Sequence, residues 1–222
     1  MTIELDRPGI ASTIDHALLR PELTIAEVLD GCALAARYEV ASVCCRPADV
    51  ERCVDALSGS PVEVGTVIGF PHGAHATGAK AFEVMTAAAQ GATEFDMVLN
   101  IGWLRSGLDV EVEADIAAVV EAAEGMIVKV IFENAYLTDS EIVRACHITE
   151  AAGAHYVKTS TGFAPSGATL ENVKLMRASV SPAVKVKASA GIRTLDDIKA
   201  FIIAGCDRIG TSSTAAILDA LG

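Results

Sequence analysis

Two lysines that end short apolar segments are the residues of this chain best suited to covalent chemistry. Lys158 ends residues 156–158 and Lys187 ends residues 184–187, and small residues and glycine follow each lysine. A lysine that faces a closed core is costly as a cation, because desolvation disfavours its charged form. Two such lysines side by side push one amine towards the neutral, nucleophilic state. A neutral amine is what a Schiff base with a carbonyl substrate requires.

A third lysine and a carboxylate fit the same site. Lys129, Lys158 and Lys187 follow one another at intervals of 29 residues, the length of one strand-and-helix unit. We therefore expect the three lysines to occupy similar heights on adjacent strands. Such a cluster needs an anion among it, and Asp96 is the candidate, because every second side chain of residues 94–98 would face inward. Asp96 would keep Lys187 cationic, and that charge would depress the pKa of Lys158.

Alternating strands and helices would position these side chains. Short β-branched runs predict strands, and alanine-rich segments of helical period, such as residues 79–90, lie between them. The predicted strands are residues 12–15, 40–45, 62–68, 94–99, 126–132, 155–158, 184–187 and 207–210.

Several predicted helices carry their own start and stop signals. Capping boxes are predicted for the pairs Thr24 with Glu27, Thr138 with Glu141, and Thr194 with Asp197. Three helices are followed at once by a glycine, which is the expected left-handed stop before the next strand. These glycines are Gly91, Gly153 and Gly205.

Strands that alternate with helices indicate a parallel sheet with crossover helices. We predict that the sheet closes into a TIM (β/α)8 barrel, which forms one α/β domain over residues 1–222. The strand count, the chain length and the lack of a glycine-rich dinucleotide fingerprint after the first strand favour a barrel. An open, doubly wound sheet is the alternative. In a barrel, the chemistry lies at the carboxyl ends of the strands, where we expect Asp15, Lys158 and Lys187.

The loops after the last predicted strands suggest an anionic substrate. They offer backbone N–H groups and hydroxyls, and the last loop runs into a short helix whose amino end favours an anion. Barrels often hold phosphate at this corner. The three loops are Ser160-Thr161-Gly162, Ser189-Ala190-Gly191 and Gly210-Thr211-Ser212-Ser213.

Composition excludes several classes of partner. A net charge of −12 argues against nucleic acid, which needs a basic face. Charged residues or glycine interrupt every apolar run, so we expect no membrane span, and the amino terminus resembles no signal peptide. The six cysteines form no paired ligand spacing, so we expect reduced core thiols and a cytoplasmic location.

Five segments resemble, in order along the chain, the deoxyribose-phosphate aldolase family. They are Ile14-Asp15-His16, Ile68-Gly69-Phe70-Pro71, Asp96-Met97-Val98-Leu99-Asn100-Ile101-Gly102, Lys158-Thr159-Ser160-Thr161-Gly162-Phe163 and Lys187-Ala188-Ser189-Ala190-Gly191-Ile192-Arg193. The resemblance extends from about the first predicted strand to Ser213. It implies a class I aldolase in a TIM barrel that reversibly cleaves 2-deoxy-D-ribose 5-phosphate to D-glyceraldehyde 3-phosphate and acetaldehyde, in deoxyribonucleotide catabolism. It further implies a homo-oligomer, either a dimer or a tetramer.

The resemblance also assigns roles. Lys158 matches the Schiff-base lysine, while Asp96 and Lys187 match the proton-relay pair. The phosphate contacts match Gly162, Gly191, Gly210, Ser212 and Ser213. Asp15 is expected to make a structural hydrogen bond or to contact a substrate hydroxyl. The chain departs from the family pattern at Ala17, Arg46, Trp103 and Ala190, which puts substrate preference in question more than reaction type.

Two other functions fit parts of the sequence. His72 and His75 have a spacing that a metal could use in a metal-dependent aldolase, although no cysteine or carboxylate ligand is close to them in the chain. A barrel that binds pyridoxal phosphate through Lys158 would also need a lysine and a phosphate corner. We expect the class I aldolase, which requires no metal and no organic cofactor.

Overall fold

A computed structural model describes residues 3–221, in which the strands close into a barrel in sequence order. Every neighbouring pair is parallel, including β8 with β1. The strands are β1 (Ile14–Leu18), β2 (Ser42–Cys45), β3 (Glu63–Ile68), β4 (Glu94–Val98), β5 (Ile127–Ile131), β6 (Tyr156–Lys158), β7 (Lys185–Ser189) and β8 (Arg208–Thr211). The predicted TIM barrel is confirmed. Residues 1–2 and 222 of the predicted domain lie outside the described residues.

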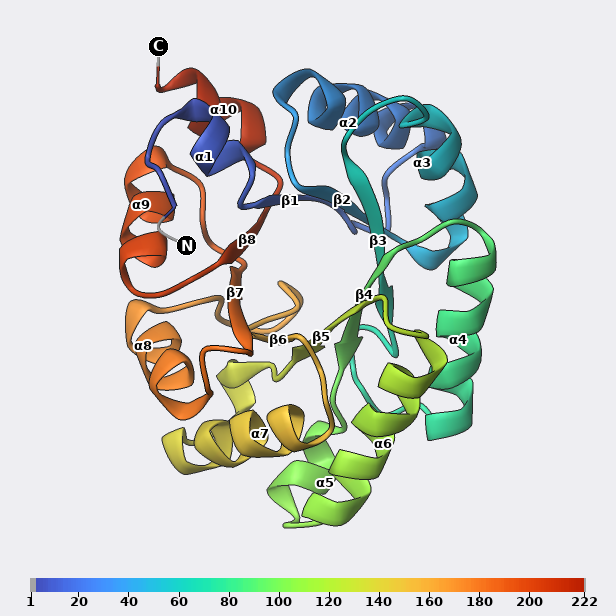
Figure 1. Ribbon diagram of the computed structural model, residues 1–222, viewed down its shortest axis with the longest axis vertical. Helices are drawn as coiled ribbons and strands as arrows, with labels where there is room; N and C mark the ends of the chain where they lie inside the picture. Colours follow the sequence, from blue (N-terminus) through green and yellow to red (C-terminus); the bar gives the residue numbers. More distant parts are fainter. Residues whose placement is uncertain (1–2, 222) are drawn as a thin grey trace.

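The helices surround the barrel as an outer ring (Figure 1). They are α1 (Arg7–Ala11), α2 (Ile25–Tyr38), α3 (Val50–Ala56), α4 (Thr77–Ala89), α5 (Ile101–Arg105), α6 (Asp109–Ala122), α7 (Asp139–Ala151), α8 (Leu170–Ser179), α9 (Leu195–Ile203) and α10 (Thr214–Asp219), with the short 3-10 helices η1 (Pro47–Asp49) and η2 (Asn134–Tyr136). None of the helices within residues 3–221 is long and apolar enough to cross a membrane.

The predicted start and stop signals of the helices are confirmed. All three capping boxes form, at Thr24, Thr138 and Thr194. The three glycines that follow helices have positive φ angles of +101° at Gly91, +80° at Gly153 and +110° at Gly205. The chain can therefore reverse from helix to strand at these joints, since glycine has no Cβ to clash.

One strand boundary differs from the prediction in a way that matters for the site. The first strand continues to Leu18, so Asp15 is its second residue and not its last. Asp15 points into the barrel below the mouth, because the pleat sends alternate side chains to opposite faces. The prediction ended this strand too early because His16 and Ala17 carry little strand propensity.

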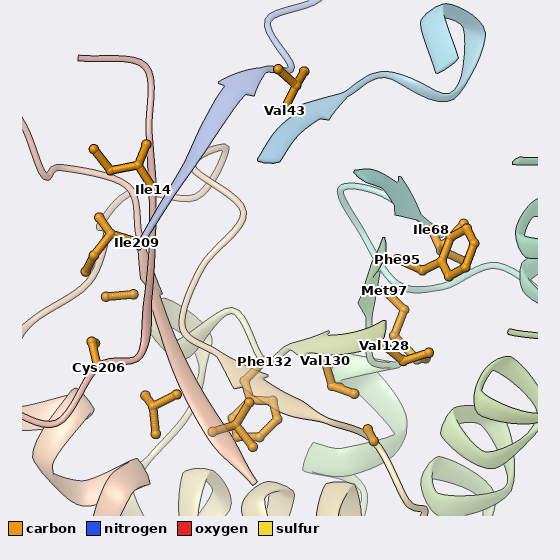
Figure 2. Packing of buried hydrophobic residues seen from close by; sticks show 14 of the residues in the cluster. Ile14, Val43, Ile68, Phe95, Met97, Val128, Val130, Phe132, Cys206 and Ile209 are labelled. Atoms are coloured by element: carbon orange, nitrogen blue, oxygen red, sulfur yellow. The ribbon is translucent and has the colours of Figure 1, made fainter. Parts of the chain in front are cut away.

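The pleat sorts the strand residues into two sets. Outward-facing apolar side chains such as Ile14, Phe95, Met97 and Val130 pack between the sheet and the helices (Figure 2). The residues that alternate with them point into the barrel and include the charged Glu94, Asp96 and Lys129 as well as the apolar Val98 and Ile131. The outward set supplies the apolar packing against the helices, so the inward positions can carry polar residues. A one-residue shift in register would exchange the two sets, so this pattern specifies the register of the strands.

Candidate active site

Asp96 lies among the three lysines, as predicted. Its Oδ2 accepts hydrogen bonds from Lys158 Nζ at 2.7 Å and Lys187 Nζ at 2.6 Å, and its Oδ1 accepts one from Lys129 Nζ at 2.8 Å. All four side chains are buried. Lys158 and Lys187 are register partners on β6 and β7, so their amines lie beside each other.

Lys129 does not lie at the height of the other two lysines, and that expectation was wrong. Lys129 pairs with Tyr156, whereas Lys158 pairs with Ile131, two residues further along β5. The interval of 29 residues counts loop residues as well as strand residues, so it does not fix register. Lys129 is instead the register partner of Asp96 on the neighbouring strand β4.

Three further charged side chains, Glu94, Arg208 and Asp15, extend this cluster inside the barrel. Glu94 accepts from Lys129 Nζ at 2.6 Å and from Arg208 Nη2 at 2.8 Å. Arg208 Nη1 donates to Asp15 Oδ1 at 2.7 Å, and Asp15 Oδ2 accepts from Lys187. The sequence patterns did not single out Glu94 or Arg208. Strand alternation could have identified both as inward-facing residues. Glu94 precedes Asp96 by two positions and so shares its face, and Arg208 directly precedes the outward-facing Ile209.

The charges of this cluster favour a neutral Lys158. Seven ionisable side chains meet inside the barrel: Asp15, Glu94, Asp96, Lys129, Lys158, Lys187 and Arg208. With every group charged, four cations would face three carboxylates. Lys158 contacts one carboxylate, whereas Lys187 contacts two. Loss of the proton from Lys158 makes the numbers of positive and negative charges equal and breaks the fewest ion pairs. This favours a neutral Lys158, since an unpaired buried charge is costly.

The pKa shifts have the same direction. Burial lowers the pKa of Lys158, and the nearby Lys187 lowers it further against the opposing pull of Asp96. Burial would also lower the pKa of Lys187, but Asp15 and Asp96 outweigh burial and raise it. For Asp96, the lysines outweigh burial and hold the pKa of the carboxyl well below its usual range. The pair thus consists of a deprotonation-prone amine beside a stable cation.

A cavity of about 230 Å³ opens above the two lysines at the carboxyl ends of the strands. Asp96 lies beneath the cavity floor. The other predicted site residues all line it: Asp15, Lys158, Thr161, Gly162, Lys187, Gly191, Gly210, Ser212 and Ser213. The barrel therefore brings together residues that were predicted from separate loops.

Two arginines add positive charge to this cavity. Arg20 from the β1–α2 loop and Arg193 from the β7–α9 loop both line it, and both are exposed. The neighbouring β8–α10 turn is fixed by Ser213 N, which donates to Thr211 Oγ1 at 3.0 Å. Cations and turn N–H groups at one end suit an anionic group such as phosphate.

Glu133 holds one wall of the cavity. Its buried carboxylate accepts from Thr161 N, 3.2 Å from Oε1, and from Thr161 Oγ1. Burial raises the pKa of Glu133, although both bonds from Thr161 oppose the rise. Glu133 has a left-handed backbone with φ +58°, which sequence patterns do not reveal for a residue other than glycine or asparagine.

The protein is similar to known aldolases over almost its whole length. Residues 8–217 match the family described as DeoC/LacD family aldolase. The chain belongs to this family. It is 51% identical over 208 residues to the deoxyribose-phosphate aldolase of Coprothermobacter proteolyticus, covering 94% of this chain and 95% of that relative. It is 53% identical over 206 residues to the deoxyribose-phosphate aldolase of Streptococcus gordonii, covering 92% of this chain and 93% of that relative.

A solved structure supports the same membership. The tetrameric deoxyribose phosphate aldolase from Aeropyrum pernix matches this DeoC/LacD aldolase with a TM-score of 0.91 and 31% sequence identity. The match covers 98% of this chain and 93% of that one.

The four departures from the family pattern have different surroundings in this DeoC/LacD aldolase. Ala17 and Ala190 line the cavity, and Ala190 has a left-handed φ of +70°. Arg46 instead pairs with Asp49 at 2.6 Å and donates to backbone carbonyls of the β1–α2 loop. Trp103 packs partly buried against the core. Only the two alanines are placed to affect a bound substrate directly.

The histidines that motivated a metal site are not gathered into one. His72 and His75 are exposed in the β3–α4 loop. Within residues 3–221, no group of three or more His, Cys, Asp or Glu side chains is placed to hold a metal ion. His16 is buried, and its Nδ1 lies 2.9 Å from Thr214 Oγ1, a structural contact.

Proposed function

We propose that this protein is a class I aldolase that reversibly cleaves 2-deoxy-D-ribose 5-phosphate to D-glyceraldehyde 3-phosphate and acetaldehyde. The observation that carries the proposal is the buried pair Lys158 and Lys187 on the floor of a cavity whose other end is cationic. Membership of the DeoC/LacD family and the names of the relatives support the substrate.

Lys158 acts as the nucleophile. Its neutral amine attacks the substrate carbonyl to give a carbinolamine, which loses water to form an iminium. A base takes the proton of the C3 hydroxyl, whose oxygen becomes the carbonyl oxygen of the leaving glyceraldehyde 3-phosphate. The electrons of the breaking C–C bond pass to the positive nitrogen, so an enamine remains on Lys158. Protonation of the enamine carbon and addition of water release acetaldehyde and restore the amine.

Asp96 and Lys187 form the proton relay. Lys187 lines the cavity, and its Nζ lies 2.6 Å from Asp96 Oδ2 below the floor. Lys187 gives a proton to the carbinolamine or the enamine and becomes a neutral amine. The adjacent Asp96 carboxylate and water help to reprotonate that amine. Asp15 has both carboxylate oxygens engaged, by Arg208, Ser42 and Lys187, so we assign it to orienting Lys187.

The substrate phosphate binds at the cationic end of the cavity. Arg20 and Arg193 supply charge there. The backbone N–H groups and hydroxyls come from Gly162, Gly191, Gly210, Ser212 and Ser213, with Thr161 beside them.

We also propose a homo-oligomer and a cytoplasmic location. The tetrameric relative from Aeropyrum pernix supports self-association. On α4, Phe82 and Met85 are exposed by 68% and 59% and lie one turn apart, which suits a subunit contact. Six buried free thiols suit a reducing compartment. Light scattering on the wild type and on Phe82→Glu tests the proposed homo-oligomer, since a monomeric wild type would contradict it.

The function is tested by acetaldehyde release from deoxyribose 5-phosphate in the presence of a chelator. We expect turnover by the wild type, and a loss of more than about 10³-fold in Lys158→Leu, because the covalent route is then closed. Lys185→Leu is the matched control, since Lys185 lies in β7 but is exposed. Loss of wild-type activity on chelation, or full activity of Lys158→Leu, would contradict the proposal.

A further inference from the structure

A second cavity, of about 350 Å³, lies beside the catalytic one. Its walls come from the segments that follow β3, β4 and β5, and include Pro71, Ile101, Gly102 and Tyr136. The catalytic cavity is lined instead by β1, β2 and the segments that end or follow β6, β7 and β8. The second cavity therefore lies on the side of the barrel mouth away from the proposed phosphate end, and the proposed reaction does not use it.

Among the described residues, only Thr161 and Phe163 line both cavities. The β6–α8 loop that carries them is therefore the partition between the two spaces. Thr161 is fixed through its N–H and hydroxyl by the buried Glu133. Phe163 N donates to Thr161 Oγ1 at 3.0 Å, which ties the second residue of the partition to the first.

The ring of Phe163 is held more loosely than its backbone. It packs edge-on against Phe70 from the β3–α4 loop, with ring centroids 5.3 Å apart and an interplanar angle of 88°. Phe163 remains 48% exposed. The ring can thus be shortened without opening the apolar core, while the loop stays anchored by Glu133.

We propose that Phe163 is a specificity-determining residue that limits the length of the aldehyde bound to Lys158, and that the second cavity is a latent subsite for an unbranched alkyl chain. This inference rests on the proposed function. With the phosphate at the β7–β8 end, a substituent on the donor aldehyde would point towards Phe163. Acetaldehyde carries no such substituent and fits in front of the ring.

The chemistry with a longer donor is unchanged. An alkanal condenses with the Lys158 amine and loses water and a proton to give the enamine. The enamine forms one C–C bond to the acceptor carbonyl, whose oxygen takes up a proton, and hydrolysis of the resulting iminium consumes one water and releases the product and the amine. Ile101, Pro71 and Ala164 make the wall of the second cavity partly apolar, which suits an alkyl chain.

The test compares kcat/KM for addition of butanal and of acetaldehyde to glyceraldehyde 3-phosphate. We expect the butanal-to-acetaldehyde ratio to rise about tenfold or more in Phe163→Ala, and less in Phe163→Leu, because each methylene admitted to a pocket changes discrimination by about this amount. Ile203→Ala, exposed on α9 and outside both cavities, is the control and should leave the ratio unchanged.

A second substitution separates the subsite from a simple widening of the catalytic cavity. Gly102 lines the second cavity, and a Cβ there would meet only Asn100 Oδ1, at 3.6 Å, so Gly102→Leu is chosen to fill that space. Added to Phe163→Ala, it should cancel the gain with butanal and leave the rate with acetaldehyde. An unchanged ratio in both Phe163 variants, or a gain that survives Gly102→Leu, would overturn the inference while leaving the aldolase proposal intact. A wild type inactive with acetaldehyde would overturn both.

Discussion

Lys158 and Lys187 are the same residue type in neighbouring strands, yet their surroundings assign them opposite charge states. Lys187 is bonded by Asp15 and Asp96 together, whereas Lys158 shares Asp96 with two other lysines. Burial acts against the cation at both positions, so the number of carboxylate partners decides which amine keeps its proton. The nucleophile is thus selected by pairing and not by residue type.

Because Lys187 helps to set the pKa of Lys158, replacing Lys187 should shift the acid limb of the pH–rate profile. Only the neutral amine attacks, so the rate of iminium formation rises as pH rises through the pKa of Lys158. Lys187→Met removes a nearby cation and frees Asp15 and Asp96, which raises that pKa and moves the acid limb to higher pH. The measurement is the rate of borohydride trapping with acetaldehyde against pH, with Lys185→Met as control. An acid limb that stays in place or moves to lower pH would be inconsistent with this account.

The sequence predicted the three lysines and Asp96 as a cluster because residue type and strand alternation are local properties. It did not predict Arg208 and Glu94, whose side chains meet across 114 positions of the chain. Arg208 also meets Asp15 across 193 positions, and only the pairing of β8 with β1 brings them together. Long-range partners of this kind depend on closure and register, which one sequence does not specify.

Strand register explains both the success and the error in placing the lysines. Lys158 and Lys187 precede similar loops and are register partners, as expected. Lys129 lies two residues lower because β5 continues past it to Ile131 before the chain leaves the barrel. Positions along a strand can be predicted from alternation, but the offset between strands is set by tertiary packing.

The close packing of β7 against β8 predicts a sensitive position at Gly210. A Cβ there would lie 2.9 Å from Ser189 Cβ and 3.4 Å from Lys187 Cε. Gly210→Ala should displace the Lys187 side chain and lower kcat by about 10- to 100-fold, with a loss of about 1–3 kcal/mol in the free energy of unfolding. Gly102→Ala, where a side chain has room, is the control. Wild-type kcat in Gly210→Ala would contradict the assigned packing.

The strands close into a barrel (Figure 1), and apolar side chains pack around it (Figure 2). The charged cluster is buried inside the barrel, so stability and catalysis share the same residues. Removing one partner from such a cluster leaves an uncompensated buried charge, which typically costs about 3–5 kcal/mol. The free energy of unfolding should therefore depend on pH through these groups.

Asp15 provides the test of that dependence. Burial raises the pKa of Asp15, but Lys187, Lys129 and Arg208 outweigh burial and lower it far below the usual value. A lowered pKa stabilises the fold at pH above about 3.9, the unfolded value, and the contribution is lost as pH falls from there towards the folded pKa. Asp15→Asn should thus be less stable than the wild type at pH 7, and the gap should narrow by about 1.4 kcal/mol per pH unit below about pH 4.

Denaturant unfolding of both proteins between pH 7 and pH 3 measures this gap. Asp55→Asn removes an exposed carboxylate and serves as the control. A gap that is independent of pH, or that widens on acidification, would show that Asp15 is not held ionised by its partners.

The most direct measurement is to trap the covalent intermediate. Borohydride added with acetaldehyde at neutral pH reduces an iminium to a stable two-carbon group, which mass spectrometry of peptides locates on one lysine. We expect the group on Lys158 of the wild type, and none in Lys158→Leu. A group on Lys187 or Lys185 of the unmutated protein, or no group at all, would contradict the assignment of Lys158 as the neutral amine that attacks the substrate.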